Sequence, residues 1–474
     1  MNVIARKCPG PVSWGSLSVP HLTLTHFLFP LAVVLCLSLG VAHSQPPAFP
    51  GAEGFGAKTP GGRGGRVIKV TNLNDSGPGS FRDALTASGP RIVVFETGGN
   101  ISLRSEIIVT QPFLTIAGQT APGEGVCVEG YPVRVSTHDL IIRGIRFRSG
   151  DKNADRKNKQ SNLRFESLHI LGRNRTPVYN LIVDHCSISW GIDKNLGVWA
   201  REEGFGFALH DITIQWCISS EALFSPLHPK GAHHAMGMFF SAVKNVSAHH
   251  NLIAHCNARN PQFSKSTEGE AINNVVYNWG TFATEIQGGA KVNVIGNYYR
   301  PGKDWTRNVK GITVEGSRQK SSLYVKGNVG PGREEDEGDD WNAVKGDPAL
   351  RSMSPVIPLS GVRTQSAKEA YALVLAHAGA LPRDPVDSRV IADIAKESGK
   401  GIASQDDIGG WPLLSTERGP RDSDEDGMPD SWESSHGLNP MDESDGTGDM
   451  NGDGYTNIEE YINGLIPQPE GIRN

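Results

Sequence analysis

The chain has 474 residues, a formal net charge of −5 at pH 7 and 38% hydrophobic residues. A mildly acidic chain without basic runs argues against a nucleic-acid partner, and its apolar content argues against intrinsic disorder. The length allows one large domain with additional modules.

The first 44 residues have the layout of a secretory signal peptide. Arg6 and Lys7 precede the apolar run FLFPLAVVLCLSLGVA, and a cleavage site is expected after Ser44. The alternative is an uncleaved membrane anchor, but a span needs about 20 apolar residues and this run is shorter. We therefore expect a secreted, extracellular protein without a membrane attachment after cleavage. The mature chain keeps four cysteines, too few for a disulfide framework: Cys127, Cys186, Cys217 and Cys256.

After a glycine-rich entry, the sequence predicts one short helix and a first series of strands. The helix is expected at residues 80–86. Alternating apolar residues between turn signals predict the strands. These are expected at residues 91–95, 107–110, 114–117, 133–136 and 140–147. The charged residues 151–161 have no apolar pattern and predict a loop.

A short phrase then recurs between Asp184 and Asn328, each copy behind alternating apolar residues. A small polar residue stands at one phase of every copy, which predicts stacked coils in which this side chain bonds to the next coil. The ladder residues are Cys186, Cys217, Asn251, Asn274, Asn297 and Asn328. The pattern predicts an all-β fold, a right-handed parallel β-helix (a solenoid) over residues 45–345. A β-propeller is the alternative, but its hairpins would need Asn-Gly or Asp-Gly pairs, which are scarce here.

The coils are expected to end near Gly330, where an acidic loop begins. Residues 346–420 predict a C-terminal segment with two amphipathic helices, at 367–377 and 386–396, packed on the coils. From residue 421 the composition changes to Asp, Gly and Asn, which marks a separate module over residues 421–474.

This tail contains two 12-residue loops, DSDEDGMPDSWE and DMNGDGYTNIEE, that match the EF-hand template. The expected calcium ligands are Asp422, Asp424, Asp426, Asp430, Glu433, Asp449, Asn451, Asp453, Asn457 and Glu460. An acidic disordered tail is the alternative, which two complete loops in tandem argue against. The short flanking helices resemble bacterial EF-hand and dockerin-like modules. A structural clip is the expected role of the two ions, and a dockerin-type protein partner is the alternative.

Three groups of residues in the coils can carry chemistry. Glu166 and Asp193 are expected on neighbouring coils, Lys230 lies in a histidine-rich loop, and Arg259 follows a strand with Lys265 nearby. Carboxylates beside cations suggest a calcium-assisted site for an anionic sugar, where cations stabilise the charge left when a proton is removed beside a carboxylate. From the residues alone, a surface turn and a solvated strand end explain the same pattern.

The histidines also raise the question of zinc. The candidates are His228, His233, His234, His249, His250 and Cys256. No CxxC or HExxH spacing is present, and paired histidines before a ladder residue are typical of coil packing.

Several long phrases resemble the pectate lyase family of the β-helix class. They include FPGAEGFGAKTPGGRGG, VTNLNDSGPGSFRDAL, TIAGQTAPGEG, VDHCSISWGIDKNL and AHHNLIAHCNARNPQF, and the resemblance covers residues 49–330. It implies secretion, calcium dependence and β-elimination of de-esterified polygalacturonate. It also implies roles: Arg259 as base, Lys230 on the substrate carboxylate, and Glu166 and Asp193 on the catalytic calcium. Lys265 is the further expected substrate contact.

The sequence departs from the family pattern at the expected metal site. The family usually has a second carboxylate four residues after the first; Gly197 stands there, and Lys194 follows Asp193. Asp184 is a substitute ligand, with a structural role as its alternative. Two other functions stay open: a glycoside hydrolase on the same fold, and a carbohydrate-binding protein that has lost activity.

Overall fold

The computed structural model describes residue 10 and residues 45–172, 176–200, 208–231, 233–306, 309–316 and 319–467. Residues from Gln45 onward form one compact unit. The predicted signal peptide lies outside the described residues, apart from Gly10. Among the described residues no helix is long and apolar enough to cross a membrane.

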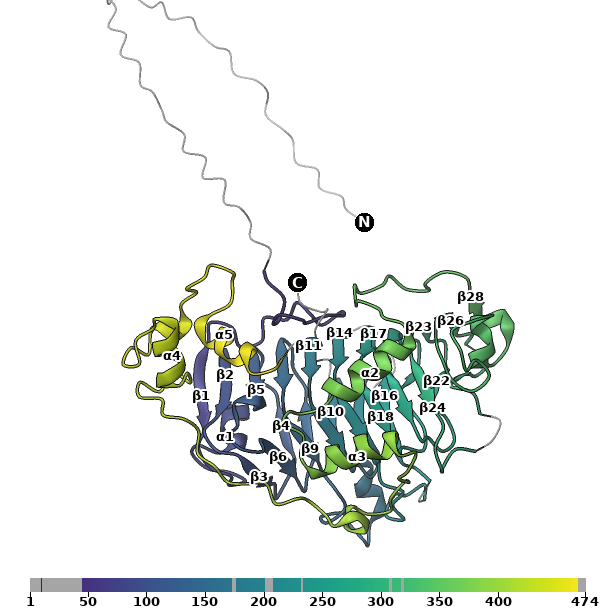
Figure 1. The fold of residues 1–474 in the computed structure, drawn as a ribbon, viewed down its shortest axis with the longest axis horizontal. Coiled ribbons are helices and arrows are strands. Elements are labelled where there is room, and N and C mark those ends of the chain that lie inside the picture. The colour runs from purple at the N-terminus through teal and green to yellow at the C-terminus, as the bar shows by residue number, and fades with distance from the viewer. Residues whose placement is uncertain are drawn as a thin grey trace, which may run out of the picture. The chain divides into compact units, whose positions relative to one another are not determined.

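Three parallel sheets run along this unit, and the chain visits them in turn (Figure 1). The 11-stranded sheet contains β1 (Arg66–Val70), β2 (Arg91–Phe95), β5 (Leu114–Ala117), β8 (Leu140–Arg143), β11 (Val178–Asp184), β14 (Leu209–Gln215), β17 (Lys244–His249), β20 (Glu268–Ile272), β23 (Lys291–Ile295), β26 (Ser322–Lys326) and β28 (Arg351–Ser352). The 9-stranded sheet contains β4 (Ile107–Val109), β7 (Val133–Val135), β10 (Glu166–Gly172), β13 (Lys194–Ala200), β16 (Met236–Ser241), β19 (Gln262–Ser264), β22 (Thr284–Ile286), β25 (Ile312–Val314) and β27 (Val344–Lys345). The 8-stranded sheet contains β3 (Gly99–Ser102), β6 (Val126–Glu129), β9 (Arg146–Arg148), β12 (Ser187–Ser189), β15 (Ile218–Ser220), β18 (Leu252–Ala254), β21 (Val275–Tyr277) and β24 (Tyr298–Arg300).

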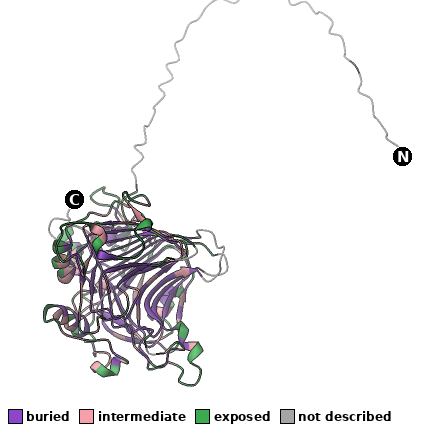
Figure 2. Cartoon of the chain, turned by 90° about the vertical axis from the view of Figure 1, so that its right-hand side faces the viewer, coloured by how far each residue is buried: buried purple, intermediate pink, exposed green. Residues whose placement is uncertain are grey.

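The prediction of an all-β parallel β-helix is confirmed, and the propeller alternative is wrong. Apolar side chains from all three sheets meet in one buried core, which is visible as the purple interior of Figure 2. Two local predictions need correction. Residues 140–147 form two strands, β8 and β9, because the chain turns at Gly144 with φ +66°. The strands also continue beyond Gly330, to β27 and β28.

The predicted ladder lies at the bend between the 11-stranded and 8-stranded sheets. Nδ2 of Asn274 donates to the carbonyl of Ala248 (2.8 Å), and its Oδ1 accepts from the backbone N–H of Asn251 (3.0 Å). The residue before each ladder position has a left-handed backbone, as at His250 with φ 54°. Each bend would otherwise leave buried amide groups unpaired, so the ladder stabilises the stack one coil at a time. The cysteines at the same phase, Cys186 and Cys217, are free thiols.

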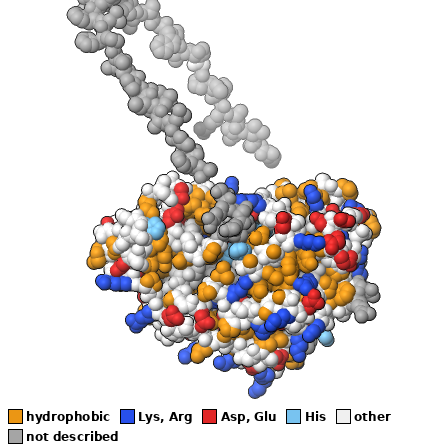
Figure 3. Space-filling model, in the orientation of Figure 1, with side chains coloured by type: hydrophobic (Ala, Val, Ile, Leu, Met, Phe, Trp, Pro, Cys, Tyr) orange, Lys and Arg blue, Asp and Glu red, His pale blue; other side chains and the backbone are white. Residues whose placement is uncertain are grey.

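The helices cover the outside of the coils. α1 (Phe81–Thr86) begins after its N-cap Ser80. α2 (Ala367–His377) and α3 (Pro385–Ala395) pack their apolar residues on β15, β18 and β21 of the 8-stranded sheet (Figure 1), as predicted. The 3-10 helices are η1 (Gly118–Thr120), η2 (Lys159–Arg164), η3 (Asp340–Ala343), η4 (Pro348–Leu350), η5 (Gln405–Ile408) and η6 (Asp445–Thr447). Figure 3 shows acidic side chains gathered at the end of the stack that carries β26 and β28.

We define the tail module as residues 421–467, with α4 (Asp430–His436) and α5 (Asn457–Gly464). Met428, Ile458 and Ile462 pack against apolar residues of β2 and β5, so the module covers the first coils (Figure 1). Nε of Arg63 donates to Glu459 at 2.9 Å, which adds a charged contact at the same place.

Candidate active site

Glu166, Asp193 and Arg259 lie at or just before the starts of three strands of the 9-stranded sheet. Glu166 begins β10 and Lys194 begins β13, and the two are register partners. Asp193 immediately precedes β13, and Arg259 lies three residues before β19. Because the coils stack in register, residues far apart in sequence lie side by side at the start of these strands.

Lys194 lies between the two carboxylates. Its Nζ donates to Oε1 of Glu166 at 2.9 Å and to Oδ2 of Asp193. The side chain is only 5% exposed, and its Nζ lies 5.7 Å from the ring centres of both Trp199 and Phe239. Burial lowers the pKa of Lys194, but the two carboxylates outweigh burial and raise it above its ordinary value. Lys194 is therefore a fixed positive charge.

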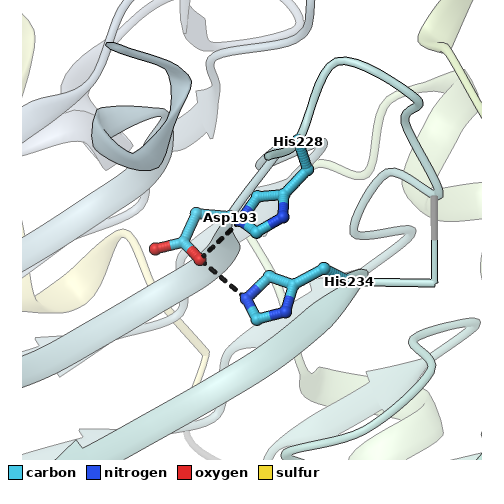
Figure 4. Close-up of side chains that lie close together, drawn as sticks. All are labelled: Asp193, His228 and His234. Carbon is cyan, nitrogen blue, oxygen red and sulfur yellow. Dashed lines mark hydrogen bonds and ion pairs between the residues drawn. The ribbon is translucent and has the colours of Figure 1, made fainter. Parts of the chain in front are cut away.

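Two imidazoles complete the contacts of Asp193 (Figure 4). Its Oδ1 lies 2.8 Å from Nε2 of His234 and 3.3 Å from Nε2 of His228, and the two rings stack with centres 3.9 Å apart. Nδ1 of His228 accepts from the backbone N–H of Lys230 at 3.0 Å, so Nε2 carries the proton of the neutral ring. Burial raises the pKa of Asp193, but Lys194 and the imidazoles hold it well below its usual range. We call Glu166, Asp193, Lys194, His228 and His234 the Lys194 cluster.

Arg259 is half-buried beside this cluster, on a left-handed backbone with φ 61°. Its Cζ lies 4.5 Å from the centre of the Phe239 ring. Burial lowers the pKa of Arg259 below its ordinary value, although Asp193, Glu285 and Glu166 act in the opposite direction. Left-handed backbone recurs at the bends of this fold, and Arg259 occupies one such bend, just before β19. A guanidinium with a lowered pKa is closer to working as a base than an ordinary arginine.

The two other predicted cations lie on loops. Lys230 is exposed, two residues after His228, and so stands on the loop that carries the imidazoles. Lys265 is also exposed but follows β19, at the opposite end of that strand from Arg259. Lys230 therefore belongs to the loop that contacts Asp193, whereas Lys265 lies at the far end of β19 from Arg259.

Asp184 is not brought to Glu166 and Asp193. It ends β11, which belongs to the 11-stranded sheet. Its Oδ2 accepts from Nε of Arg143 (2.8 Å) and its Oδ1 from Nε2 of Gln215 (2.8 Å). Both oxygens are therefore used in buried coil packing, which agrees with the structural alternative for this residue.

Comparisons with known proteins agree with this geometry. The chain is 34% identical over 446 residues to "Probable pectate lyase C" of Aspergillus flavus, covering 92% of this chain and 98% of that protein. The protein of the same name from Aspergillus terreus is 33% identical over 457 residues, with coverage of 92% and 99%. The chain belongs to the pectate lyase family. As a member it is a polysaccharide lyase.

Solved structures of pectate lyases share the fold. A pectate lyase bound to a hexasaccharide superposes with a TM-score of 0.52 and 14% identity, covering 72% of this chain and 99% of that chain. A variant of the Bacillus subtilis pectate lyase gives a TM-score of 0.51 and 15% identity, with coverage of 72% and 98%. No family model matches the sequence.

The arrangement does not fit the calcium ion that resemblance to pectate lyases predicts on Glu166 and Asp193. One oxygen of each carboxylate faces Nζ of Lys194, in the gap that a shared ion would need. A side chain at Gly197 would not help, because its Cβ would lie 2.1 Å from Oε2 of Glu166. The glycine thus provides the space that the Glu166 carboxylate occupies. Asp193, His228 and His234 have ligand atoms within 4.8 Å of one another, but these atoms are already paired.

Sequence reasoning gave no role in this site to four of its residues, which are Lys194, His228, His234 and Glu285. His234 contacts Asp193, and its only signal was membership of a histidine-rich loop. Glu285 lies in β22 opposite Gln262 of β19, on the strand next to Arg259. Burial raises the pKa of Glu285 to about 7, although Arg259 lowers it. The sequence pointed to Glu285 only through its position in the coil repeat, one coil after the strand that follows Arg259.

The first tail loop, by contrast, has the properties of a cation-binding site. Ligand oxygens of Asp422, Asp424 and Asp426 converge, and so do those of Asp426, Glu433 and Asp445. Glu433 is fully buried, and within the described part of the chain neither of its carboxylate oxygens has a hydrogen-bond partner. Burial and the neighbouring carboxylates raise the pKa of Asp426 to about 7. These residues therefore fit a hard divalent cation.

Asp445 is a residue that the loop template could not predict. It lies between the two loops, in η6, and its Oδ1 is buried without a partner. The residues at position 9, Asp430 and Asn457, instead accept hydrogen bonds from the backbone N–H groups of Ser423 (2.7 Å) and Met450 (3.1 Å). Each of these side chains therefore links the end of its loop to the loop's first residues.

The second tail loop is more exposed but has the same internal geometry. Asp449 accepts from the backbone N–H groups of Gly452 (2.7 Å) and Gly454 (2.9 Å). Nδ2 of Asn451 lies 3.3 Å from Asp453 and 3.4 Å from Glu460, so three of the predicted ligands lie together.

Proposed function

We propose that the protein is an exported pectate lyase that cleaves de-esterified polygalacturonate by β-elimination. The observation that carries this proposal is Arg259: a half-buried side chain with a lowered pKa that lies over the Phe239 ring, beside the charges of the Lys194 cluster. Its position beside the outer face of stacked strands suits a linear polymer. The full-length relatives named probable pectate lyase support the same reaction class.

The chemistry follows from the charges. A base removes the proton at C5 of a uronate, and the electron pair is delocalised onto the adjacent carboxylate. Cations beside that carboxylate stabilise the charge that develops. The bond between C4 and the bridging oxygen then breaks, a C4–C5 double bond forms, and the leaving oxygen takes a proton from water.

Within this scheme each residue has one role. Arg259 receives the C5 proton as its neutral guanidine, a form that the lowered pKa makes more accessible, and becomes a guanidinium again. Lys230, exposed on the neighbouring loop, binds the substrate carboxylate. Asp193 and Glu166 hold Lys194 in place, and the imidazoles of His228 and His234 orient Asp193.

The geometry argues against the hydrolase alternative. An inverting hydrolase needs a water between its two carboxyl groups, and a retaining one needs a carboxylate free to attack the sugar. Here an ammonium lies between Glu166 and Asp193. The pair therefore lacks the space and the freedom that hydrolysis requires.

The test is the product formed from polygalacturonate of low methyl content. Elimination yields an unsaturated uronide that absorbs in the ultraviolet, whereas hydrolysis yields new reducing ends without that absorbance. We expect Arg259→Ala to lower kcat by roughly 10²–10⁴-fold, the usual contribution of a general base. Arg421→Ala is the matched control, because the Arg421 side chain is 83% exposed in the tail module. Unchanged turnover of Arg259→Ala would remove Arg259 from the mechanism.

We also propose that the tail module holds calcium as a structural clip. The unpartnered oxygens of Asp424, Asp426, Glu433 and Asp445 support the first site, and the clustered ligands of the second loop support the other. Apolar residues of the module are packed on β2 and β5, which supports a structural role for the bound ions. Export is tested separately, by sequencing the N-terminus of the secreted protein, which should begin after Ser44.

A further inference from the structure

Lys194 stands where a shared metal ion would have to stand. Its Nζ lies 2.9 Å from Oε1 of Glu166 and within hydrogen-bond distance of Oδ2 of Asp193. Calcium binds carboxylate oxygens at 2.3–2.6 Å. An ion bridging the same two oxygens would therefore overlap the ammonium. The lysine and a bridging calcium exclude each other.

The surroundings of Lys194 hold the ammonium in this position. The side chain is 5% exposed, and its Nζ lies 5.7 Å from the ring centres of Trp199 and Phe239. Cation–π contacts of this kind stabilise a positive charge that has lost its water. Gly197 belongs to the same arrangement, because any side chain there would displace the Glu166 carboxylate that accepts from Lys194. The two departures from the family pattern, Lys194 and Gly197, therefore depend on each other: the glycine leaves room for the carboxylate that the lysine binds.

We infer that Lys194 is the resident cation of this cluster, so that Glu166 and Asp193 bind no calcium ion. If the proposed function holds, the elimination then proceeds with protein cations alone at this position. The calcium requirement of the protein would be confined to its tail module.

The charge balance agrees with this inference. The carboxylates of Glu166 and Asp193 are balanced by Lys194 and by the neighbouring guanidinium of Arg259, which acts on the pKa of Lys194. A divalent ion in place of the ammonium would bring a second positive charge next to Arg259. A monovalent, covalently attached cation keeps the cluster near neutrality without depending on the metal concentration.

Terbium luminescence provides a direct test on the full-length protein, because a nearby tryptophan sensitises a bound terbium ion. Nε1 of Trp199 lies 3.4 Å from Oε1 of Glu166, so an ion in the cluster would be excited through Trp199. Trp432 adjoins Glu433 and reports on the tail. We expect Trp432→Phe to lower the terbium emission several-fold and Trp199→Phe to leave it unchanged. Both substitutions keep an aromatic ring, which favours folding.

A variant that creates a metal site in the cluster shows whether Trp199 can report a bound terbium ion there. In Lys194→Glu a third carboxylate replaces the ammonium, and a Trp199-dependent emission should appear. The inference is overturned if Trp199→Phe lowers the emission of the wild-type protein, or if Lys194→Glu creates no new signal. Neither readout needs turnover. Failure to form an unsaturated uronide would therefore contradict the proposed function without affecting this inference. A Trp199-dependent terbium emission in the wild-type protein would contradict this inference without affecting the proposed function.

Discussion

The Lys194 cluster and the first tail loop are two groups of buried carboxylates with opposite needs. In the cluster, Glu166 and Asp193 face an ammonium that the chain supplies. In the tail, both carboxylate oxygens of Glu433 and Oδ2 of Asp426 are buried and have no donor among the described residues. Burying a carboxylate costs several kcal/mol unless an opposite charge compensates.

The difference shows which site depends on its environment. The cluster carries its own cation and should be complete as soon as the chain folds. The first tail loop is complete only when a cation comes from solution, so that its stability follows the calcium concentration. A chelator should therefore destabilise the tail module and leave the Lys194 cluster unchanged.

The largest effect should come from removing the internal cation. Lys194→Met keeps the aliphatic stem and leaves two buried carboxylates uncompensated, so we expect the free energy of unfolding to fall by about 3–5 kcal/mol. Urea unfolding in the presence of a chelator measures the loss. Lys194→Arg keeps the charge and is the control, with a smaller loss expected. Equal stability of Lys194→Met and wild type would erase the contrast between the two sites.

Calcium binding to the tail should change the free energy of unfolding slightly less than the Lys194→Met substitution does. At a calcium concentration 100-fold above Kd, binding stabilises the folded protein by about 2.7 kcal/mol. We expect Glu433→Gln and Asp445→Asn to lose most of this gain, measured as the calcium-dependent rise in Tm. Asp442→Asn is the matched control, because Asp442 is exposed and its side chain accepts from Ser444 in the same segment. A full calcium response in Asp445→Asn would show that this residue is not a ligand.

The fold was predictable because its cause is repetitive. Alternating apolar residues and the ladder side chains Asn251, Asn274 and Asn297 repeat once per coil, and a repeat needs no long-range information to be recognised. The same phase would also have placed Asp184 correctly. It stands two residues before the ladder residue Cys186, at the end of a strand of the 11-stranded sheet, as Gln215 does before Cys217.

The site was less predictable because it depends on register between coils. Glu166 and Asp193 were identified by resemblance, but the position of Lys194 between them follows from its pairing with Glu166 across two strands. Asp445 was missed for a related reason. It reaches the first loop from outside the 12-residue template, so only the packing of the tail module reveals it.

The smallest expected change in stability concerns Glu285. This active-site carboxylate is buried, and among the contacts described it has no lysine partner. Burial raises its pKa to about 7, so folding favours the protonated form. The contribution of Glu285 to stability is therefore fully present below its unfolded pKa, near 4.5, and is lost as the pH rises through 7. Between pH 5 and pH 8 we expect Glu285→Gln to lose about 1–2 kcal/mol less stability than wild type.

Urea unfolding at the two pH values, at constant calcium concentration, measures this difference. Glu335→Gln is the control, since the Glu335 side chain is 67% exposed and should show the pH dependence of the wild type. If Glu285→Gln and wild type lose equal stability, Arg259 compensates Glu285 as fully as Lys194 compensates Glu166 and Asp193. The active site would then contain no carboxylate without a cation, and the contrast with the tail would be complete.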